Sequence, residues 1–168
     1  MAKVVLKLGD DISTDIIYPG RFLSTVLPTE TPQYTFADHT EFNTRLRKGE
    51  IPPESIIVGG KNFGCGSSRE QAASCLKGWN LVVVARHFAR IFLQNSINLG
   101  LQTVICPDIE ANEKDELEIT PDKVINKSSG KSFDVVPLPE TRQAIIDAGG
   151  LVLYTRQRLL QAEKGKLD

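Results

Sequence analysis

Between residues 55 and 107 the chain alternates three short apolar runs with two segments of helical pattern. The runs are "SIIVGG" (Ser55–Gly60), "LVVVA" (Leu81–Ala85) and "LQTVICP" (Leu101–Pro107), and each has the length and β-branched content of a buried strand. "REQAASCLKGW" and "HFARIFLQNSINLG" lie between them, and Gly100 is placed to end the second helix. A β-α-β-α-β order favours parallel strands with right-handed crossovers. The pattern therefore predicts an α/β fold.

The flanking segments predict further elements around this unit. "VVLKL" (Val4–Leu8) reads as a first strand, and the apolar spacing from Phe36 to Lys48 indicates a helix. After residue 115, short antiparallel strands are expected, with a turn at Ser128–Gly130. The tail from Pro139 has two helical pieces that break at Gly149–Gly150. A mixed sheet, or two sheets, follows from this order.

The composition is that of one ordinary globular domain. The chain has 168 residues, 40% of them hydrophobic and 24% charged, so we expect a single domain over residues 1–168, with the tail from about residue 163 disordered. The net charge is -1 and the pI is 6.1, which gives no electrostatic basis for binding nucleic acid or an anionic membrane. The longest apolar runs are far too short to span a membrane.

The cysteines point to a reducing compartment. Cys65, Cys75 and Cys106 form no CxxC pair and have no nearby pair of histidines. This spacing argues against a disulfide framework and against a zinc or iron–sulfur site within this chain. Met1 leads directly into a strand pattern rather than a secretory signal. We therefore expect a cytoplasmic protein.

The segment between the first strand and the predicted helix, "GDDISTDIIYPGRFLSTVLPTETP", is long for a connection in a compact domain. Such loops often carry function. Asp10, Asp11 and Asp15 raise the question of a divalent metal, but their spacing is not that of a calcium-binding loop. Turns rich in Asp and Thr usually cap their own backbone. We assign no metal to them.

The stretch "NFGCGSSREQA" (Asn62–Ala72) has a purely structural interpretation. Ser67 and Glu70 fit the S-x-x-E capping box, in which the two side chains satisfy free amides at a helix start. The glycines before them would then serve only a tight turn with positive φ. Cys65 is expected to be a small, partly buried filler.

The same stretch also fits an anion-binding site. A helix N-terminus gathers free N–H groups and a positive dipole end, which suit a carboxylate or a phosphate. Gly60, Gly64 and Gly66 let a ligand approach the backbone, and Arg69 offers a planar fork for a carboxylate. A serine such as Ser67 would lose its proton more readily among such amides, because they stabilise the alkoxide.

Several familiar motifs are excluded for this loop. It lacks the Gly-Lys-Ser/Thr of a P-loop, the third glycine of a dinucleotide fingerprint and the Gly-x-Ser-x-Gly of a hydrolase. A small carboxylic acid therefore suits the loop better than a nucleotide. His39, in the predicted helix, and His87, at the start of the next, are expected to be structural rather than catalytic.

Three blocks together carry a family resemblance. "GDDISTDIIYPGRFL", "NFGCGSSREQA" and "HFARIFLQNSINLGL" resemble, in this order, the small subunits of the isopropylmalate dehydratase and homoaconitase family, which correspond to the swivelling domain of aconitase. The blocks span Gly9 to Leu101. One departure is Gln71, where many members have histidine; glutamine occurs in homoaconitase-like members, so the change bears on the substrate and not on the chemistry.

The resemblance implies an α/β swivelling domain of β/β/α layers, with a mainly parallel central sheet. It also implies a large-subunit partner, in a heterodimer or heterotetramer, that carries a [4Fe–4S] cluster with one iron open to substrate; this chain would hold no cofactor. The reaction is a dehydration and rehydration that moves a hydroxyl to the neighbouring carbon. By the same resemblance, Ser67 is the catalytic base, Arg69 binds a substrate carboxylate, and Ser68 and Gly66 contact substrate or hold the loop.

The substrate depends on the segment from Tyr18 to Pro28. Homoaconitase-type members resemble it but place an arginine where Ser24 stands, which matches an additional carboxylate. Its apolar character therefore favours the isopropyl branch of 3-isopropylmalate, and thus leucine biosynthesis. Arg21 leaves an alternative open, because a loop shift would bring its guanidinium to the pocket. The specificity loop is predicted to comprise Arg21, Phe22, Leu23, Ser24 and Thr25.

Three alternatives remain at this stage. Two are related hydro-lyase subunits, a homoaconitase or a dimethylmalate dehydratase. The third is a non-catalytic module that binds carboxylates without any cluster-bearing partner.

Overall fold

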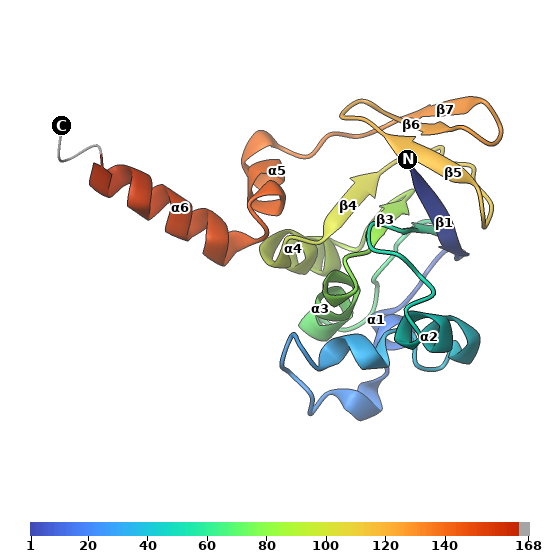
Figure 1. The fold of residues 1–168 in the computed structure, drawn as a ribbon, viewed down its shortest axis with the longest axis horizontal. Coiled ribbons are helices and arrows are strands. Elements are labelled where there is room, and N and C mark those ends of the chain that lie inside the picture. Colours follow the sequence, from blue (N-terminus) through green and yellow to red (C-terminus); the bar gives the residue numbers. More distant parts are fainter. Residues whose placement is uncertain (165–168) are drawn as a thin grey trace.

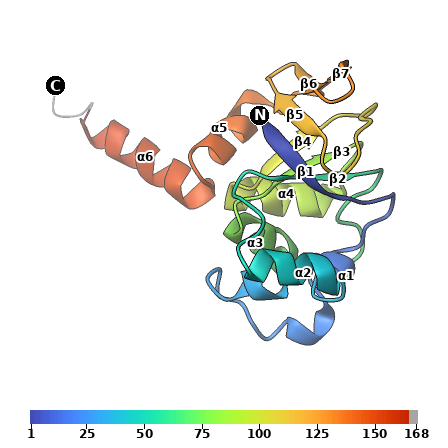
Figure 2. The same ribbon diagram turned by 45° about the vertical axis from the view of Figure 1, so that its right-hand side comes forward.

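The computed structural model describes residues 1–164, which form one mixed sheet flanked by helices (Figures 1 and 2). The strands are β1 (Ala2–Lys7), β2 (Ile56–Gly59), β3 (Val82–Ala85), β4 (Gln102–Ile105), β5 (Glu116–Ile119), β6 (Lys123–Asn126) and β7 (Lys131–Asp134). The α-helices are α1 (Thr14–Ile17), α2 (Thr40–Arg47), α3 (Glu70–Gly78), α4 (Arg90–Leu99), α5 (Glu140–Asp147) and α6 (Leu151–Lys164), and the 3-10 helices are η1 (Gly20–Phe22) and η2 (Thr31–Tyr34).

The sheet has the order β4-β3-β2-β1-β5-β6-β7. Strands β1 to β4 are parallel, whereas β5 to β7 are joined to β1 and to one another by antiparallel pairing. The apolar runs of the parallel part lie in register, with Val58 opposite Val84 and Val84 opposite Val104. The α/β fold with a mainly parallel central sheet that the sequence predicts is confirmed.

Alternate residues of the parallel strands enter two different cores. Val5, Ile57 and Val83 belong to the core that contains α3 and α4. Their neighbours, such as Val4 and Val84, belong to a second core with residues of β5 and β6. The antiparallel strands thus cover one face of the parallel sheet while the helices cover the other, as Figure 1 shows. This arrangement is the β/β/α layering expected above.

The helix predicted from Phe36 to Lys48 begins later than expected, at Thr40. Phe36 has a φ of 49° and a fully buried ring, and its N–H donates to the Ile17 carbonyl at 2.7 Å. A residue in the left-handed region cannot continue an α-helix. Tertiary anchoring of this ring therefore delays the helix, and His39 stands before it instead of within it.

The C-terminal part follows the predicted break at two glycines. Gly100 ends α4 with a φ of 71°, and a Cβ there would lie 2.4 Å from the Gly149 carbonyl carbon. Gly149 and Gly150 separate α5 from α6, which projects away from the body (Figure 2). Most of the tail predicted to be disordered falls at residues 165–168, outside the described residues, although residues 163 and 164 belong to α6. None of the described helices has the length and apolarity needed to cross a membrane.

Candidate functional site

The loop that follows β2 is tied along its length to the segment that follows β1. The Gly60 N–H donates to the Gly9 carbonyl at 3.0 Å, and the Gly64 N–H donates to the Ile12 carbonyl at 2.7 Å. Further along, the Thr14 N–H donates to the Cys65 carbonyl at 2.8 Å. Two segments about fifty residues apart in sequence thus run side by side, so the functional blocks predicted from the sequence meet in space.

Aspartates of the first segment add to this connection. The Asp10 carboxylate accepts from the Lys61 N–H at 2.7 Å, and the Asp11 carboxylate accepts from the Asn62 side-chain amide at 2.8 Å. These aspartates therefore secure the neighbouring loop rather than cap their own turn.

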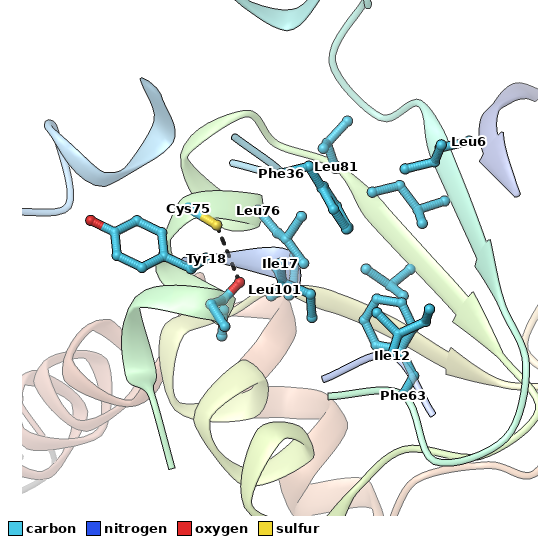
Figure 3. Packing of buried hydrophobic residues seen from close by; sticks show 14 of the residues in the cluster. Leu6, Ile12, Ile17, Tyr18, Phe36, Phe63, Cys75, Leu76, Leu81 and Leu101 are labelled. Carbon is cyan, nitrogen blue, oxygen red and sulfur yellow. Dashed lines mark hydrogen bonds between the residues drawn. The ribbon is translucent and has the colours of Figure 1, made fainter. Parts of the chain in front are cut away.

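The other side of the loop is held by the connection between β3 and α4. The Phe63 N–H donates to the His87 carbonyl at 2.9 Å, and the Phe63 ring is buried with Ile12 in the core that Figure 3 shows. Gly64 has a φ of 81°, and a Cβ on it would lie 2.1 Å from Cγ of Phe92. Only glycine meets both conditions, which explains one glycine of the motif by packing and not by ligand approach.

Ser67 lies on the surface and is contacted by a buried threonine. The Thr14 hydroxyl donates to the Ser67 carbonyl at 3.0 Å, and the two hydroxyl oxygens are 3.3 Å apart. Thr14 is only 2% exposed, whereas Ser67 is exposed. Sequence reasoning missed Thr14, although it stands within the block "GDDISTD" that carries part of the resemblance.

The capping-box interpretation of Ser67 and Glu70 is wrong. Helix α3 has Arg69 at its N-cap, with no side-chain cap, so Ser67 stands two residues before the cap. Hydrogen bonds between Thr14 and Ser67 take the place of the local bond that a capping serine would make. Within residues 1–164 the backbone N–H groups of Gly66, Ser67 and Ser68 have no protein acceptor. These amides are therefore free to bind an anion.

Arg69 is held beside the same loop by an acidic partner. Its Nη1 contacts the Asp15 carboxylate and also donates to the Tyr18 carbonyl at 3.3 Å, and its side chain is 20% exposed. The same carboxylate oxygen accepts from the Gly20 N–H at 2.8 Å. The hydrogen bond from Arg69 lowers the pKa of Asp15 below 3.8, with the Gly20 amide contributing. Asp15 is thus ionised at neutral pH and orients the guanidinium.

Arg21 is paired with a different carboxylate from the one that holds Arg69. Its guanidinium donates to Asp38 at 2.5 and 3.0 Å and lies 4.7 Å from the ring centroid of Phe22. The Arg21 side chain is 55% exposed. The structure therefore has Arg21 as an exposed, paired side chain.

The rest of the predicted specificity loop is supported by aromatic side chains. Phe22 stacks on Tyr34 with centroids 4.1 Å apart, and the Tyr18 hydroxyl donates to the Phe22 carbonyl at 3.1 Å. Leu23 and Ser24 are exposed, and Thr25 is half-buried. Gln71 of α3 donates to the Leu23 carbonyl at 3.5 Å. The residue at which this chain departs from many family members thus contacts the specificity loop.

Neither histidine begins or lies in a helix as the sequence suggests. His39 is exposed and packs edge-on against Phe42, with centroids 6.1 Å apart. His87 is exposed in the loop before α4, which begins only at Arg90, and its carbonyl holds Phe63. Both have contacts that fit a structural role.

The cysteines of this chain do not fit an iron–sulfur cluster of its own. Cys75 lies in the helix-side core and Cys106 in the other core, and burial raises their thiol pKa values to about 12 and about 11. Cys65 is half-buried in the loop. Within residues 1–164, no group of three or more His, Cys, Asp or Glu side chains could hold a metal ion.

Ser67 and Arg69 do not line the cavity of about 500 Å³ that lies at the ends of β1 and β2. That cavity is lined instead by residues such as Lys7, Arg86 and Lys131. Ser67 is instead exposed to solvent.

Comparisons with known proteins identify the family to which this chain is similar. The Aconitase C-terminal domain family matches residues 11–108. A "3-isopropylmalate dehydratase small subunit" of Methanosarcina mazei is 39% identical over 90% of this chain and 93% of its own length. One from Methanopyrus kandleri is 44% identical over 94% of this chain and 93% of its own length.

A solved structure is similar over nearly its whole length. The crystal structure of 3-isopropylmalate dehydratase (LeuD) from Methanocaldococcus jannaschii aligns with a TM-score of 0.85 and 35% identity, over 96% of this chain and 97% of that one. The resemblance predicted from the three sequence blocks is confirmed. The chain belongs to the aconitase C-terminal domain family, with small subunits of 3-isopropylmalate dehydratase among its relatives.

Proposed function

We propose that this chain is the small subunit of a hydro-lyase that interconverts 2-isopropylmalate and 3-isopropylmalate by dehydration and rehydration, a step of leucine biosynthesis. One observation carries the proposal. The exposed Ser67 lies against the buried Thr14, in a loop whose amides at residues 66–68 have no acceptor within residues 1–164. An exposed hydroxyl beside amides without acceptors supports a role in which Ser67 bears negative charge.

In this proposal, Ser67 takes the proton from the substrate carbon and returns it in the reverse direction. The free amides stabilise the alkoxide, because they are oriented before the reaction begins. Arg69 binds a substrate carboxylate while Asp15 keeps its guanidinium in place, and Ser68 and Gly66 contact the substrate through their N–H groups. The open site would let a partner subunit complete the enclosure.

The partner is a large subunit, in a heterodimer or heterotetramer. The relatives are named small subunits, and the described residues hold no set of metal ligands of their own. A [4Fe–4S] cluster on the partner would supply the Lewis acid for the departing hydroxyl. The expected compartment is the cytoplasm.

The substrate assignment rests on the exposed Leu23 and Ser24 beside the half-buried Phe22. These side chains offer no charge to a second distal carboxylate, which would then be desolvated without compensation. Arg21 would have to leave Asp38 to supply that charge. 3-Isopropylmalate is therefore favoured over homoaconitate, which carries that additional carboxylate.

Anaerobic reconstitution with the cognate large subunit tests the function. Ser67→Ala should lower kcat by about a thousandfold, as expected for loss of a positioned base, while substrate still binds. Ser132→Ala, at an exposed position in β7, is the matched control and should retain full turnover. Near-normal turnover by Ser67→Ala would remove the assignment of the base.

The same reconstituted complex distinguishes between the alternative substrates, and between an enzyme subunit and a binding module. Faster turnover of homocitrate than of isopropylmalate would overturn the substrate assignment and leave the chemistry intact. Binding of the acid by the free chain, with no turnover in the reconstituted pair, would instead identify a carboxylate-binding module.

A further inference from the structure

We propose that the Thr14 hydroxyl is a positioning group that holds the Ser67 side chain and stabilises its deprotonated form. The inference rests on the proposed role of Ser67 as base and goes beyond it, because it assigns a second residue to the reaction.

The position of Thr14 is determined from several directions. Its N–H donates to the Cys65 carbonyl at 2.8 Å, and its hydroxyl donates to the Ser67 carbonyl at 3.0 Å. The side chain is 2% exposed, and its β-branched form restricts χ1. The Thr14 oxygen is thus held 3.3 Å from the Ser67 hydroxyl oxygen.

The proton count gives this contact a direction. A threonine hydroxyl has one proton and two lone pairs. While Thr14 donates that proton to the Ser67 carbonyl, the Ser67 hydroxyl has to be the donor in the contact between the two hydroxyls. The Ser67 hydroxyl is thereby oriented with its proton towards the Thr14 hydroxyl oxygen.

Deprotonation of Ser67 reverses this contact. The Ser67 proton moves to or from the substrate carbon, and Thr14 keeps its own proton. The Thr14 hydroxyl then turns from the carbonyl oxygen to the alkoxide, replacing a neutral hydrogen bond with a charge-assisted one. The charge-assisted bond is stronger than the neutral bond to the carbonyl that it replaces, and the buried Thr14 hydroxyl faces little competition from water.

Another pair of buried hydroxyls in the same domain provides the matched control. Thr31 is fully buried, and its hydroxyl oxygen lies 3.0 Å from that of Ser74. Thr31→Val and Thr14→Val therefore remove similar hydrogen bonds from similar surroundings. Only Thr14→Val removes a bond to the proposed base.

The experiment measures the pH dependence of turnover by the reconstituted complex. Thr14→Val should lower kcat by about thirtyfold and change KM by less than about threefold, because the lost bond is strongest to the charged base. In the pH profile, the midpoint of the rise in kcat should move up by about one pH unit, since Ser67 becomes harder to deprotonate. Thr14→Ser should restore kcat to within about threefold of wild type.

Thr31→Val should leave kcat and the midpoint of the pH profile unchanged while it lowers the melting temperature. Thr14→Val in the Ser67→Ala background should cause no further loss of turnover. A normal kcat and an unchanged midpoint of the pH profile in Thr14→Val would overturn the inference. An equal loss of kcat in Thr31→Val would also overturn it. If Thr14→Val fails to fold, Thr14→Ala takes its place, and the same midpoint of the pH profile is measured for it.

The two proposals fail in different ways. Full turnover by Ser67→Ala removes the proposed function. Loss of turnover by Ser67→Ala together with a normal Thr14→Val removes only the role of Thr14.

Discussion

The loop at residues 60–69 and the specificity loop at residues 21–25 are held in place differently. The first is bound to residues far away in the sequence, from the segments around residues 9–14 and 87–89. The second is bound mainly to its own neighbours, as where the Leu23 N–H donates to the Gly20 carbonyl and the Thr25 N–H donates to the Phe22 carbonyl. Long-range bonds fix the proposed base, whereas local turns shape the proposed selectivity.

This difference separates chemistry from specificity. A base must stay aligned to within a fraction of an ångström, which the surrounding cores of the domain enforce. A specificity loop with exposed side chains can change residues at little cost to the fold. We therefore expect substitutions in the first loop to affect folding and turnover, and substitutions in the second to affect substrate choice.

The largest effect is expected at Gly64. Gly64→Ala places a Cβ against Phe92 and holds an alanine at a positive φ. Together these two effects should lower the free energy of unfolding by about 3 kcal/mol. Gly130→Ala is the control, because Gly130 has a φ of 74° and nothing within 4 Å of the added Cβ; it should cost about 1 kcal/mol. Urea unfolding of the free chain measures both, and equal costs would show that packing does not hold this loop.

Asp15→Asn should have the next largest effect, on substrate binding. Without its carboxylate partner the Arg69 guanidinium loses its orientation, so KM should rise by about tenfold with a smaller change in kcat. Steady-state kinetics of the reconstituted complex measures this. An unchanged KM would mean that the Tyr18 carbonyl alone holds Arg69.

The same aspartate predicts a dependence on acid pH. Its pKa in the folded chain lies below 3.8, so the folded state binds fewer protons than the unfolded state in acid. The stability from the pair with Arg69 is therefore present above pH 3.8 and lost as pH falls through the lowered pKa. Asp15→Asn should show a shallower loss of stability below pH 3.8 than wild type in acid unfolding followed by circular dichroism.

A smaller change is expected from Ser24→Arg in the specificity loop. The new cation should raise the ratio of kcat/KM for homoaconitate over that for isopropylmalate by about fivefold, through pairing with the additional carboxylate. Thr29→Arg adds the same charge at an exposed position further along and should leave this ratio at its wild-type value. Competition assays with both acids measure it, and equal responses would mean that charge alone, without placement, sets selectivity.

The smallest effect concerns Arg21 and Asp38. Both side chains are more than half exposed, so a double-mutant cycle with alanine should give a coupling energy close to the error of the measurement, and this energy should weaken further with salt. A larger coupling would show that this pair holds the specificity loop as firmly as the long-range bonds hold the Ser67 loop.

The sequence by itself determined the order of elements and the parallel core. Apolar runs of strand length, the glycine after α4 and the paired glycines before α6 are local signals, and each marks an element found near its predicted place. The combination of three blocks also identified the family, and the first two blocks lie in segments that meet in space.

Only the tertiary structure decided how these residues are used. The contact between Thr14 and Ser67 joins residues that are 53 positions apart. The hydrogen bond that holds Phe36 outside its predicted helix joins it to Ile17, in another segment. Local capping preferences amount to about 1 kcal/mol, so burial of a ring or a long-range hydrogen bond can override them. The N-cap at Arg69 and the partner of the proposed base were therefore settled by the packing of distant segments, which no local pattern encodes.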